Sequence, residues 1–99
     1  MDGISTFPWL PTHVTGTLLV KTGAGSLHSI VVNGLTTAGD ATVYDGISNA
    51  GVVLAVLHLD VTTSVSVQPI TFLYDMKILT GIYIEYDQAL VADLTVTHH

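Results

Sequence analysis

The stretch 41-ATVYDGISNAG-51, which runs into 52-VVLAVLHL-59, decides the fold of this chain. A short β-prone segment ends in Tyr44-Asp45, and a loop of Gly, Ser, Asn and Ala leads into the most hydrophobic segment of the protein. Turn residues between two such runs predict a β-hairpin. Residues 52–59 are apolar on both faces of the expected strand, so both faces need cover. A two-sheet sandwich covers only one face of each sheet. We therefore expect the other face of this strand to contact an arm, a loop or a neighbouring subunit.

The remaining sequence predicts further strands and no helix. Alternating apolar and polar residues place Ala92, Leu94 and Val96 on the inner face of one strand. Pro69 lies within another apolar segment and cannot donate to a ladder, so that segment is an edge strand, a bulge or two short strands. The expected strands are residues 15–21, 27–32, 41–44, 52–59, 65–74, 82–86 and 92–97. About seven short strands between Gly-rich turns predict an all-β fold, an antiparallel β-sandwich of jelly-roll type.

The composition limits the partners that the protein can have. The 99 residues suffice for one domain, and only 10% are charged, against about 25% in an average soluble domain. The formal net charge is −6, and Lys21 and Lys77 are the only Lys or Arg residues. Binding to nucleic acid or to an anionic membrane needs clustered cations, so neither is expected as a partner. No apolar run approaches the roughly 20 residues of a membrane span, and the sequence start has no signal-peptide pattern, which predicts synthesis in the cytoplasm.

The N-terminal residues predict an extended arm, residues 1–13, ahead of a β-sandwich domain, residues 14–99. Two prolines restrict the backbone around Trp9. Trp9 either folds onto its own domain or docks on a neighbouring subunit, because aromatic residues are favoured interface anchors. The predicted interface residues, from the arm and from the strand at 52–59, are Phe7, Trp9, Leu10, Val53 and Leu57.

The sequence predicts no catalytic residues, no metal site and no cofactor, and hence no enzyme. There are no cysteines, and His13, His28 and His58 are scattered without the spacing of metal ligands. No Asp-x-Asp-x-Asp calcium loop and no G-x-S-x-G nucleophile motif is present. We expect Asp45 to accept backbone N–H bonds in its loop, as Asp commonly does in turns. No function is assigned to His98 and His99, which are either native or the start of a purification tag.

Aromatic residues offer a second hypothesis, a glycan-binding platform. Tyr44 with Asn49, or Tyr83 with Asp87, would combine a ring for stacking on a sugar with a polar partner. The alternative is that these tyrosines pack against each other across neighbouring strands.

Four short motifs in a fixed order carry a family resemblance. They are 25-GSLHSIVVN-33, 42-TVYDG-46, 81-GIYI-84 and 92-ADLTV-96. Their order and spacing over residues 17–97 resemble small β-sandwich structural proteins encoded among the virion genes of tailed bacteriophages. The resemblance implies a virion component, most often a capsid decoration (cement) protein that binds the major capsid protein or another virion protein as a homo-oligomer, expected to be a trimer. A receptor- or glycan-binding module of a head or tail fibre is the alternative. The resemblance supplies no catalytic residue and does not include the arm.

Overall fold

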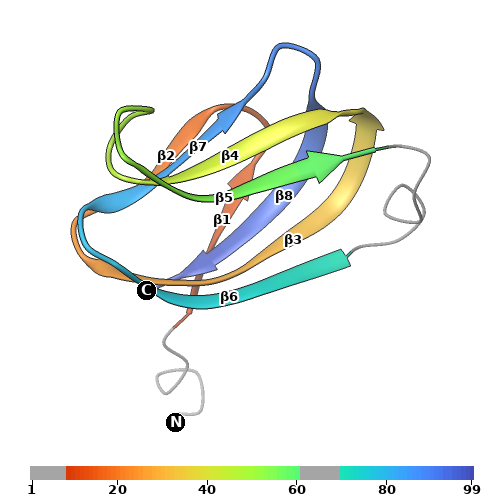
Figure 1. Ribbon diagram of the computed structural model, residues 1–99. Helices are drawn as coiled ribbons and strands as arrows, with labels where there is room; N and C mark the ends of the chain where they lie inside the picture. The colour runs from red at the N-terminus through yellow and green to blue at the C-terminus, as the bar shows by residue number, and fades with distance from the viewer. Residues whose placement is uncertain (1–8, 61–69) are drawn as a thin grey trace, which may run out of the picture.

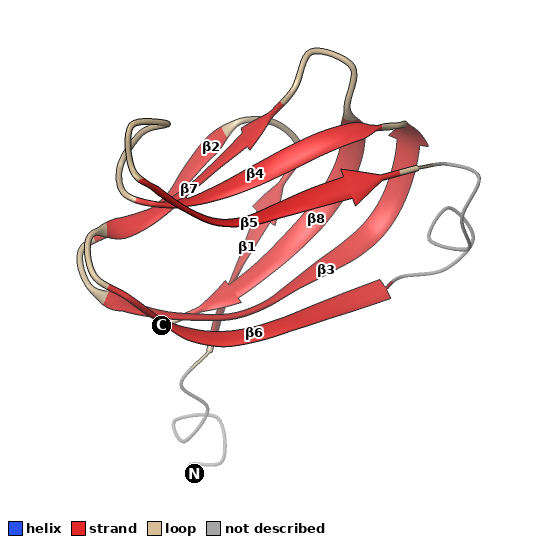
Figure 2. Cartoon of the chain, viewed as in Figure 1, coloured by secondary structure: helices blue, strands red, loops and turns tan. Residues whose placement is uncertain are grey.

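The computed structural model describes residues 9–60 and 70–99, and these residues form strands joined by turns (Figure 1). Within this part of the chain no helix is present (Figure 2). The eight strands are β1 (Leu10–Val14), β2 (Leu18–Thr22), β3 (Gly25–Thr37), β4 (Gly39–Asp45), β5 (Val52–Leu59), β6 (Ile70–Ile78), β7 (Gly81–Tyr86) and β8 (Val91–His98). The predicted all-β class is confirmed, with eight strands in place of about seven.

The strands form two antiparallel four-stranded sheets that pack face to face. One sheet has the order β1-β8-β3-β6 and the other β2-β7-β4-β5, and Figure 1 shows them as two layers. The chain pairs β4 with β5, β3 with β6, β2 with β7 and β1 with β8, and successive pairs fall in opposite sheets. A long antiparallel hairpin wound into two layers in this way is an eight-stranded jelly roll, so the predicted architecture is confirmed.

The β4–β5 hairpin lies at the tip of this winding, and its predicted pairing is confirmed. Its loop begins and ends with glycines whose backbones are in close contact. A Cβ atom on Gly51 would lie 2.6 Å from the carbonyl oxygen of Asp45 and 2.9 Å from the Cα atom of Gly46. Side chains at these two positions would therefore force the hairpin loop open.

β5 is an edge strand, and its irregular register changes which of its side chains are buried. The pairing shifts between Val43 and Tyr44, so that Val43 pairs with Ala55 and Tyr44 with Val53. A bulge of this kind changes the face on which the following residues lie. Leu57 therefore lies in the core, 5% exposed, while Val53 is 54% exposed. The prediction of Leu57 as an interface residue is wrong, whereas Val53 does lie on the surface.

The N-terminal boundary of the sandwich lies earlier than predicted. β1 starts at Leu10 and pairs with β8 along its whole length, so residues 10–13 belong to the sheet and not to an arm. Pro11 is compatible with this strand because β1 is at a sheet edge. Phe7 lies outside the described residues.

β3 and β6 are both irregular where they pair with their neighbours. The strand predicted at residues 27–32 is longer than expected, since β3 continues to Thr37 and accommodates Gly34 through a register shift against β8. β6 begins at Ile70 and is an edge strand, one of the three options for this segment, whereas its bulge lies at Tyr74 and Asp75, away from Pro69. Pro69 itself lies outside the described residues.

Apolar side chains from both sheets form one core between the layers. The predicted alternation in β8 is confirmed, since Ala92, Leu94 and Val96 are all buried. The hydroxyl of Tyr86 in β7 donates to the carbonyl oxygens of Val14 (3.2 Å) and Ala92 (3.0 Å). Val14 lies in β1 and Ala92 in β8, and both strands belong to the opposite sheet. Burial, together with the charge of Asp93, raises the pKa of Tyr86 to about 12, so this link between the sheets is neutral at ordinary pH.

His98 is a buried polar residue at one end of the core. Its side chain is 6% exposed, and Nε2 lies 2.9 Å from Oγ1 of Thr12. Nδ1 is buried and forms no hydrogen bond within the described part of the chain. Burial lowers the pKa of His98, and the neighbouring charges of Lys21 and His99 act in the same direction. His98 and His99 are thus integrated into the sheet, with His99 bonded through its backbone to Ser26.

We expect the domain to lose stability as the pH falls from 7.5 to 5.5. A histidine with a lowered folded-state pKa binds protons more readily in the unfolded state, so the stabilisation by neutral His98 is present above the unfolded pKa of about 6.5 and is lost below it. Urea unfolding at the two pH values measures the change, and His98→Gln should make it smaller. His58→Gln is the matched control, since the His58 side chain is 75% exposed. An unchanged pH dependence in His98→Gln would contradict the assignment.

Candidate functional site

The outer face of the β2-β7-β4-β5 sheet carries a continuous row of apolar and aromatic side chains. Leu19 pairs with Tyr83, Tyr83 with Tyr44, and Tyr44 with Val53, so one residue from each of the four strands lies in register. Leu19 is 38% and Val53 54% exposed, and both tyrosines are partly exposed. We call these four residues the aromatic row.

A carboxylate and an amide lie beside the two tyrosines. The rings of Tyr44 and Tyr83 are 6.2 Å apart and tilted by 48°. The Tyr44 hydroxyl donates to Oε1 of Glu85 (3.2 Å), and Nδ2 of Asn49, in the β4–β5 loop, donates to Oε2 (3.3 Å). Burial, and after it the hydrogen bond to Glu85, raises the pKa of Tyr44. The phenol therefore remains a neutral donor, and Glu85 is held in place on the face.

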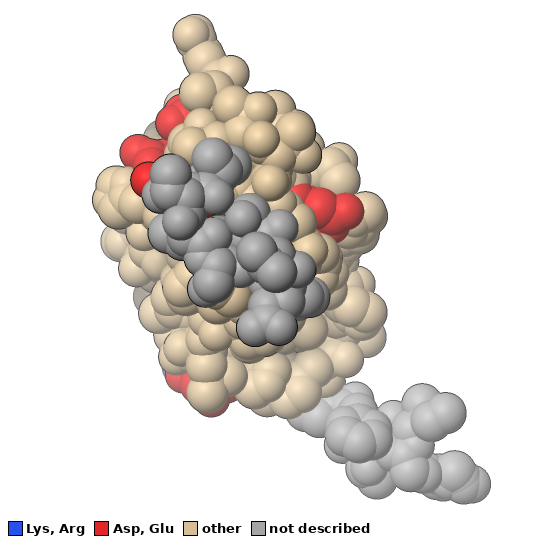
Figure 3. All heavy atoms as spheres, turned by 90° about the vertical axis from the view of Figure 1, so that its right-hand side faces the viewer, with Lys and Arg blue, Asp and Glu red and all other residues tan. Residues whose placement is uncertain are grey.

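A groove continues from Glu85 toward the turn between β7 and β8. Its volume is about 410 Å³, and it is lined by Asp40, Thr42, Glu85, Tyr86, Asp87 and Gln88. We call it the acidic groove. Figure 3, a view from the right-hand side of Figure 1, shows acidic side chains at several places among uncharged residues. The aromatic row and the acidic groove together form a surface that is apolar on one side and negatively charged on the other.

Asp87 has a structural role at the end of this groove. Its carboxylate accepts the backbone N–H groups of Asp40 (2.8 Å), Leu90 (2.9 Å) and Ala89 (3.1 Å). These bonds, that of Asp40 first, lower the pKa of Asp87. Asp87 therefore closes its turn, with its carboxylate bonded to backbone N–H groups.

The predicted platform residues are brought together only in part. Tyr44, Asn49 and Tyr83 lie together, and the cross-strand packing of the two tyrosines is confirmed. Glu85, which connects Tyr44 and Asn49, was absent from the predicted site. The alternation in β7 places Glu85 on the same face as Tyr83, but the pairing of β7 with β4 is a long-range feature that the sequence does not display.

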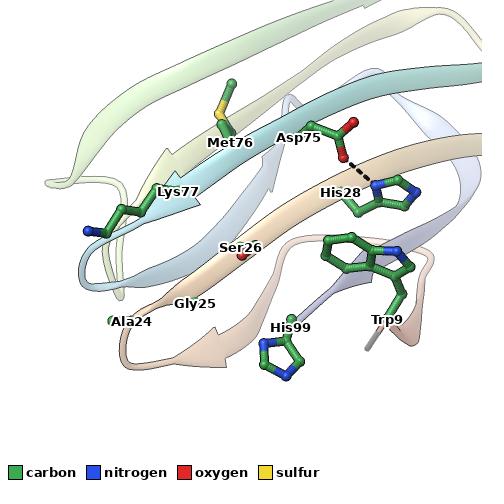
Figure 4. Close-up of a pocket in the computed structure, with 9 residues that line it drawn as sticks. All are labelled: Trp9, Ala24, Gly25, Ser26, His28, Asp75, Met76, Lys77 and His99. Carbon is green, nitrogen blue, oxygen red and sulfur yellow. Dashed lines mark hydrogen bonds and ion pairs between the residues drawn. The ribbon is translucent and has the colours of Figure 1, made fainter. Parts of the chain in front are cut away.

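A second hollow of about 920 Å³, which we call the Trp9 hollow, lies near the β2–β3 turn (Figure 4). The Trp9 ring stacks on His28, with 4.2 Å between the ring centroids and an angle of 6°. Nδ1 of His28 pairs with a carboxylate oxygen of Asp75, while Lys77 extends away from the stack. Of the two predicted arm residues in this region, Trp9 packs on its own domain, and Leu10 is 57% exposed.

A bulge between β3 and β6 positions the His28–Asp75 pair. Tyr74 and Asp75 lie opposite the single residue His28, and the φ angle of Asp75 is +47°. Asp tolerates this left-handed conformation better than most residues. Ser26 lies two residues from His28 along β3, and no hydrogen bond joins the two side chains within the described structure.

Histidine–aspartate pairs recur on the surface of the described part of the chain, but they do not extend to a third metal-ligating side chain. His13 Nε2 lies 2.6 Å from Asp93, whose pKa is lowered by hydrogen bonds from Asn33 and then from His13. His58 lies 2.9 Å from Asp40. Among residues 9–60 and 70–99, no three His, Cys, Asp or Glu side chains converge as metal ligands would.

Comparison with known proteins found no matching family model, no matching curated protein and no matching solved structure. The described residues include no helix that is long and apolar enough to cross a membrane.

Proposed function

We propose that this chain is a structural protein of a bacteriophage virion, a capsid decoration (cement) protein that binds the assembled head as a homo-oligomer. The observation that carries the proposal is the aromatic row on the outer face of the β2-β7-β4-β5 sheet. Large apolar side chains that stay exposed on an ordered sheet face commonly mark a contact surface for another macromolecule. Val52, Val56 and Ile47, which are 69%, 43% and 59% exposed, are further apolar residues of β5 and the β4–β5 loop.

Two further points support a virion role. The four sequence motifs resemble those of small phage structural proteins, and the jelly roll is an architecture that viral capsid proteins use. Lectins and cupins also use it, so the architecture alone does not assign a function. The low charge and the exposed apolar row favour a protein that works by binding within an assembly, without chemistry of its own.

A specific observation favours the alternative, a receptor- or glycan-binding module. Tyr44 and Tyr83 lie beside the carboxylate of Glu85 and the amide of Asn49. Rings with flanking hydrogen-bonding groups could hold a sugar by stacking and by bonds to its hydroxyl groups. In this arrangement Glu85 adds a carboxylate to the predicted pair of Tyr44 and Asn49.

Cosedimentation with capsids tests the decoration proposal. The purified protein is mixed with undecorated heads of the phage that encodes it, and we expect saturable recovery in the capsid pellet. Light scattering of the free protein at micromolar concentration should show the predicted trimer. Failure to pellet, together with binding to an immobilised glycan array, would replace the decoration proposal with the glycan alternative. Failure in both assays would reject both functions.

A further inference from the structure

We infer that the aromatic row and the acidic groove bind a basic, apolar segment of another protein, with an arginine side chain placed over the tyrosines and paired with Glu85. The inference rests on the proposed assembly function, because it names the chemistry of the partner at the same surface.

The first step is that the bonds to Glu85 come from neutral donors. Its two carboxylate oxygens accept one hydrogen bond from the Tyr44 hydroxyl and one from the Asn49 amide. Each carboxylate oxygen can accept more than one bond, so the group has capacity left for a cationic donor. The bonds from Tyr44 and Asn49 also restrict the side chain, which reduces the entropy that a partner would have to overcome.

The second step is that the lysines of the chain lie elsewhere. Nζ of Lys21 donates to the carbonyl oxygens of Gly23 (3.0 Å) and Ala24 (2.9 Å). Lys77 lines the Trp9 hollow, together with Ala24. The sequence holds only these two Lys or Arg residues. Neither lysine therefore lies at Glu85, and the histidine at the groove, His58, pairs with Asp40 instead, which leaves Glu85 open to a cation from another molecule.

A second copy of this chain does not fit as the occupant of the aromatic row and the acidic groove. A face-to-face pair of copies would bring together two acidic grooves and two molecules of formal net charge −6. Like charges placed opposite each other at an interface cost several kcal/mol. Oligomerisation of this chain therefore uses another surface, and the occupant of this face is a different, basic protein.

The fourth step concerns the side chain that would fit best. An arginine has a planar guanidinium group that stacks on aromatic rings and donates two parallel hydrogen bonds to a carboxylate. The Tyr44 hydroxyl donates to Glu85, so the carboxylate lies directly beside the Tyr44 side chain. One guanidinium group can therefore stack on the ring and pair with the carboxylate. Leu19 and Val53, at the two ends of the row, provide apolar contacts for the neighbouring residues of the segment. A lysine would form the ion pair but would not stack in the same way.

The test uses a labelled peptide in which arginine alternates with leucine, with fluorescence anisotropy to measure binding and NMR to locate it. We expect the backbone amide signals of Tyr44, Tyr83 and Glu85 to shift. Affinity should fall on replacing the arginines with lysines and be lost on replacing them with glutamates. Glu85→Gln keeps the size and hydrogen-bonding capacity of the side chain and should weaken binding about tenfold, the order expected for one charge-assisted contact.

Asp75→Asn is the matched control. It removes one negative charge, as Glu85→Gln does, but at the Trp9 hollow, and Asn tolerates the left-handed backbone of residue 75. Its affinity should stay within about twofold of the wild-type value, since a distant exposed charge is largely screened by salt. Equal losses in both variants would show a general charge effect and overturn the inference. Unchanged binding in Glu85→Gln, or equal binding of the glutamate peptide, would also overturn it, as would binding of glycans but not of the arginine peptide to the tyrosines.

The same variants separate this inference from the decoration proposal. If Glu85→Gln and wild type pellet equally well with capsids, the inference fails and the decoration proposal stands. If the wild-type protein binds the arginine peptide through Glu85 but does not pellet with capsids, the partner chemistry holds and the decoration proposal falls.

Discussion

Replacing Gly81 with alanine is expected to lower the free energy of unfolding by about 3 kcal/mol, the upper part of the range for overpacking in a well-packed site. A Cβ atom at this position would lie 2.7 Å from the carbonyl oxygen of Lys21 and 2.9 Å from that of Gly46. Both are backbone atoms, so no side chain can rotate away. The methyl group would have to displace β2 or the β4–β5 loop.

Gly34→Ala is the control for this effect. Gly34 lies in β3, has no neighbouring atom within 4 Å of a Cβ, and does not have a positive φ angle. Because alanine restricts the unfolded chain, this variant should be neutral or gain up to about 1 kcal/mol. Urea unfolding of the two variants gives the comparison, and a loss in Gly81→Ala no larger than in Gly34→Ala would show that the β2 and loop contacts yield freely.

Removing the carboxylate of Asp45 is expected to cost about 2 kcal/mol. Asp45 accepts the backbone N–H groups of Thr80 (2.8 Å), Leu79 (3.0 Å) and Gly81 (3.3 Å). A hydrogen bond to a charged group contributes about 1.5–3 kcal/mol, but Leu79 and Thr80 lie at exposed positions where water can replace part of the loss. Asp45→Ala should therefore lose less than the sum of three bonds. Asp45→Asn, which keeps one carbonyl acceptor, should lie between alanine and the wild type.

The pH dependence provides an independent check on Asp45. The N–H bonds, that of Leu79 first, lower its pKa below the usual 3.8. A carboxyl group with a lowered folded-state pKa contributes stability above its unfolded pKa, and this contribution is lost as the pH falls through the folded value. The difference between wild type and Asp45→Ala should thus be constant near neutral pH and shrink below about pH 4. A difference that persists undiminished at lower pH would contradict the role of the ionised carboxylate.

Much of the fold could be predicted from local patterns, because alternation and turn residues act over short distances. The alternation of Ala92, Leu94 and Val96 and the loop that ends at Gly51 correctly indicated a buried strand face and a hairpin. The capping role of Asp45 was predicted, but its partners are in the β6–β7 turn instead of its own loop. Local patterns show that an Asp will accept N–H bonds, but not which turn the tertiary structure brings to it.

The features that could not be predicted depend on pairing between distant strands. The bulge opposite Val43 decides that Val53 is exposed and Leu57 is buried, and strict alternation alone puts both on one face. Glu85 joins Tyr44 because β4 and β7 are neighbours in the sheet. The β1 strand was missed since the prolines around Trp9 suggested an arm, whereas an edge strand tolerates Pro11.

The winding of the chain also has a consequence for the order of events during folding. Among the strand pairs of the two sheets, only β4 and β5 are consecutive in the chain. β7 and β8 are interior strands of their sheets, flanked by partners that precede them by many residues. Neither β1 nor β2 has its partner until the last third of the chain has been synthesised. The same holds for β3, whose partners are β6 and β8. A nascent chain therefore keeps three β-prone segments unpaired until late in translation, and its refolding should be slow, in the millisecond-to-second range typical of non-local β-topologies.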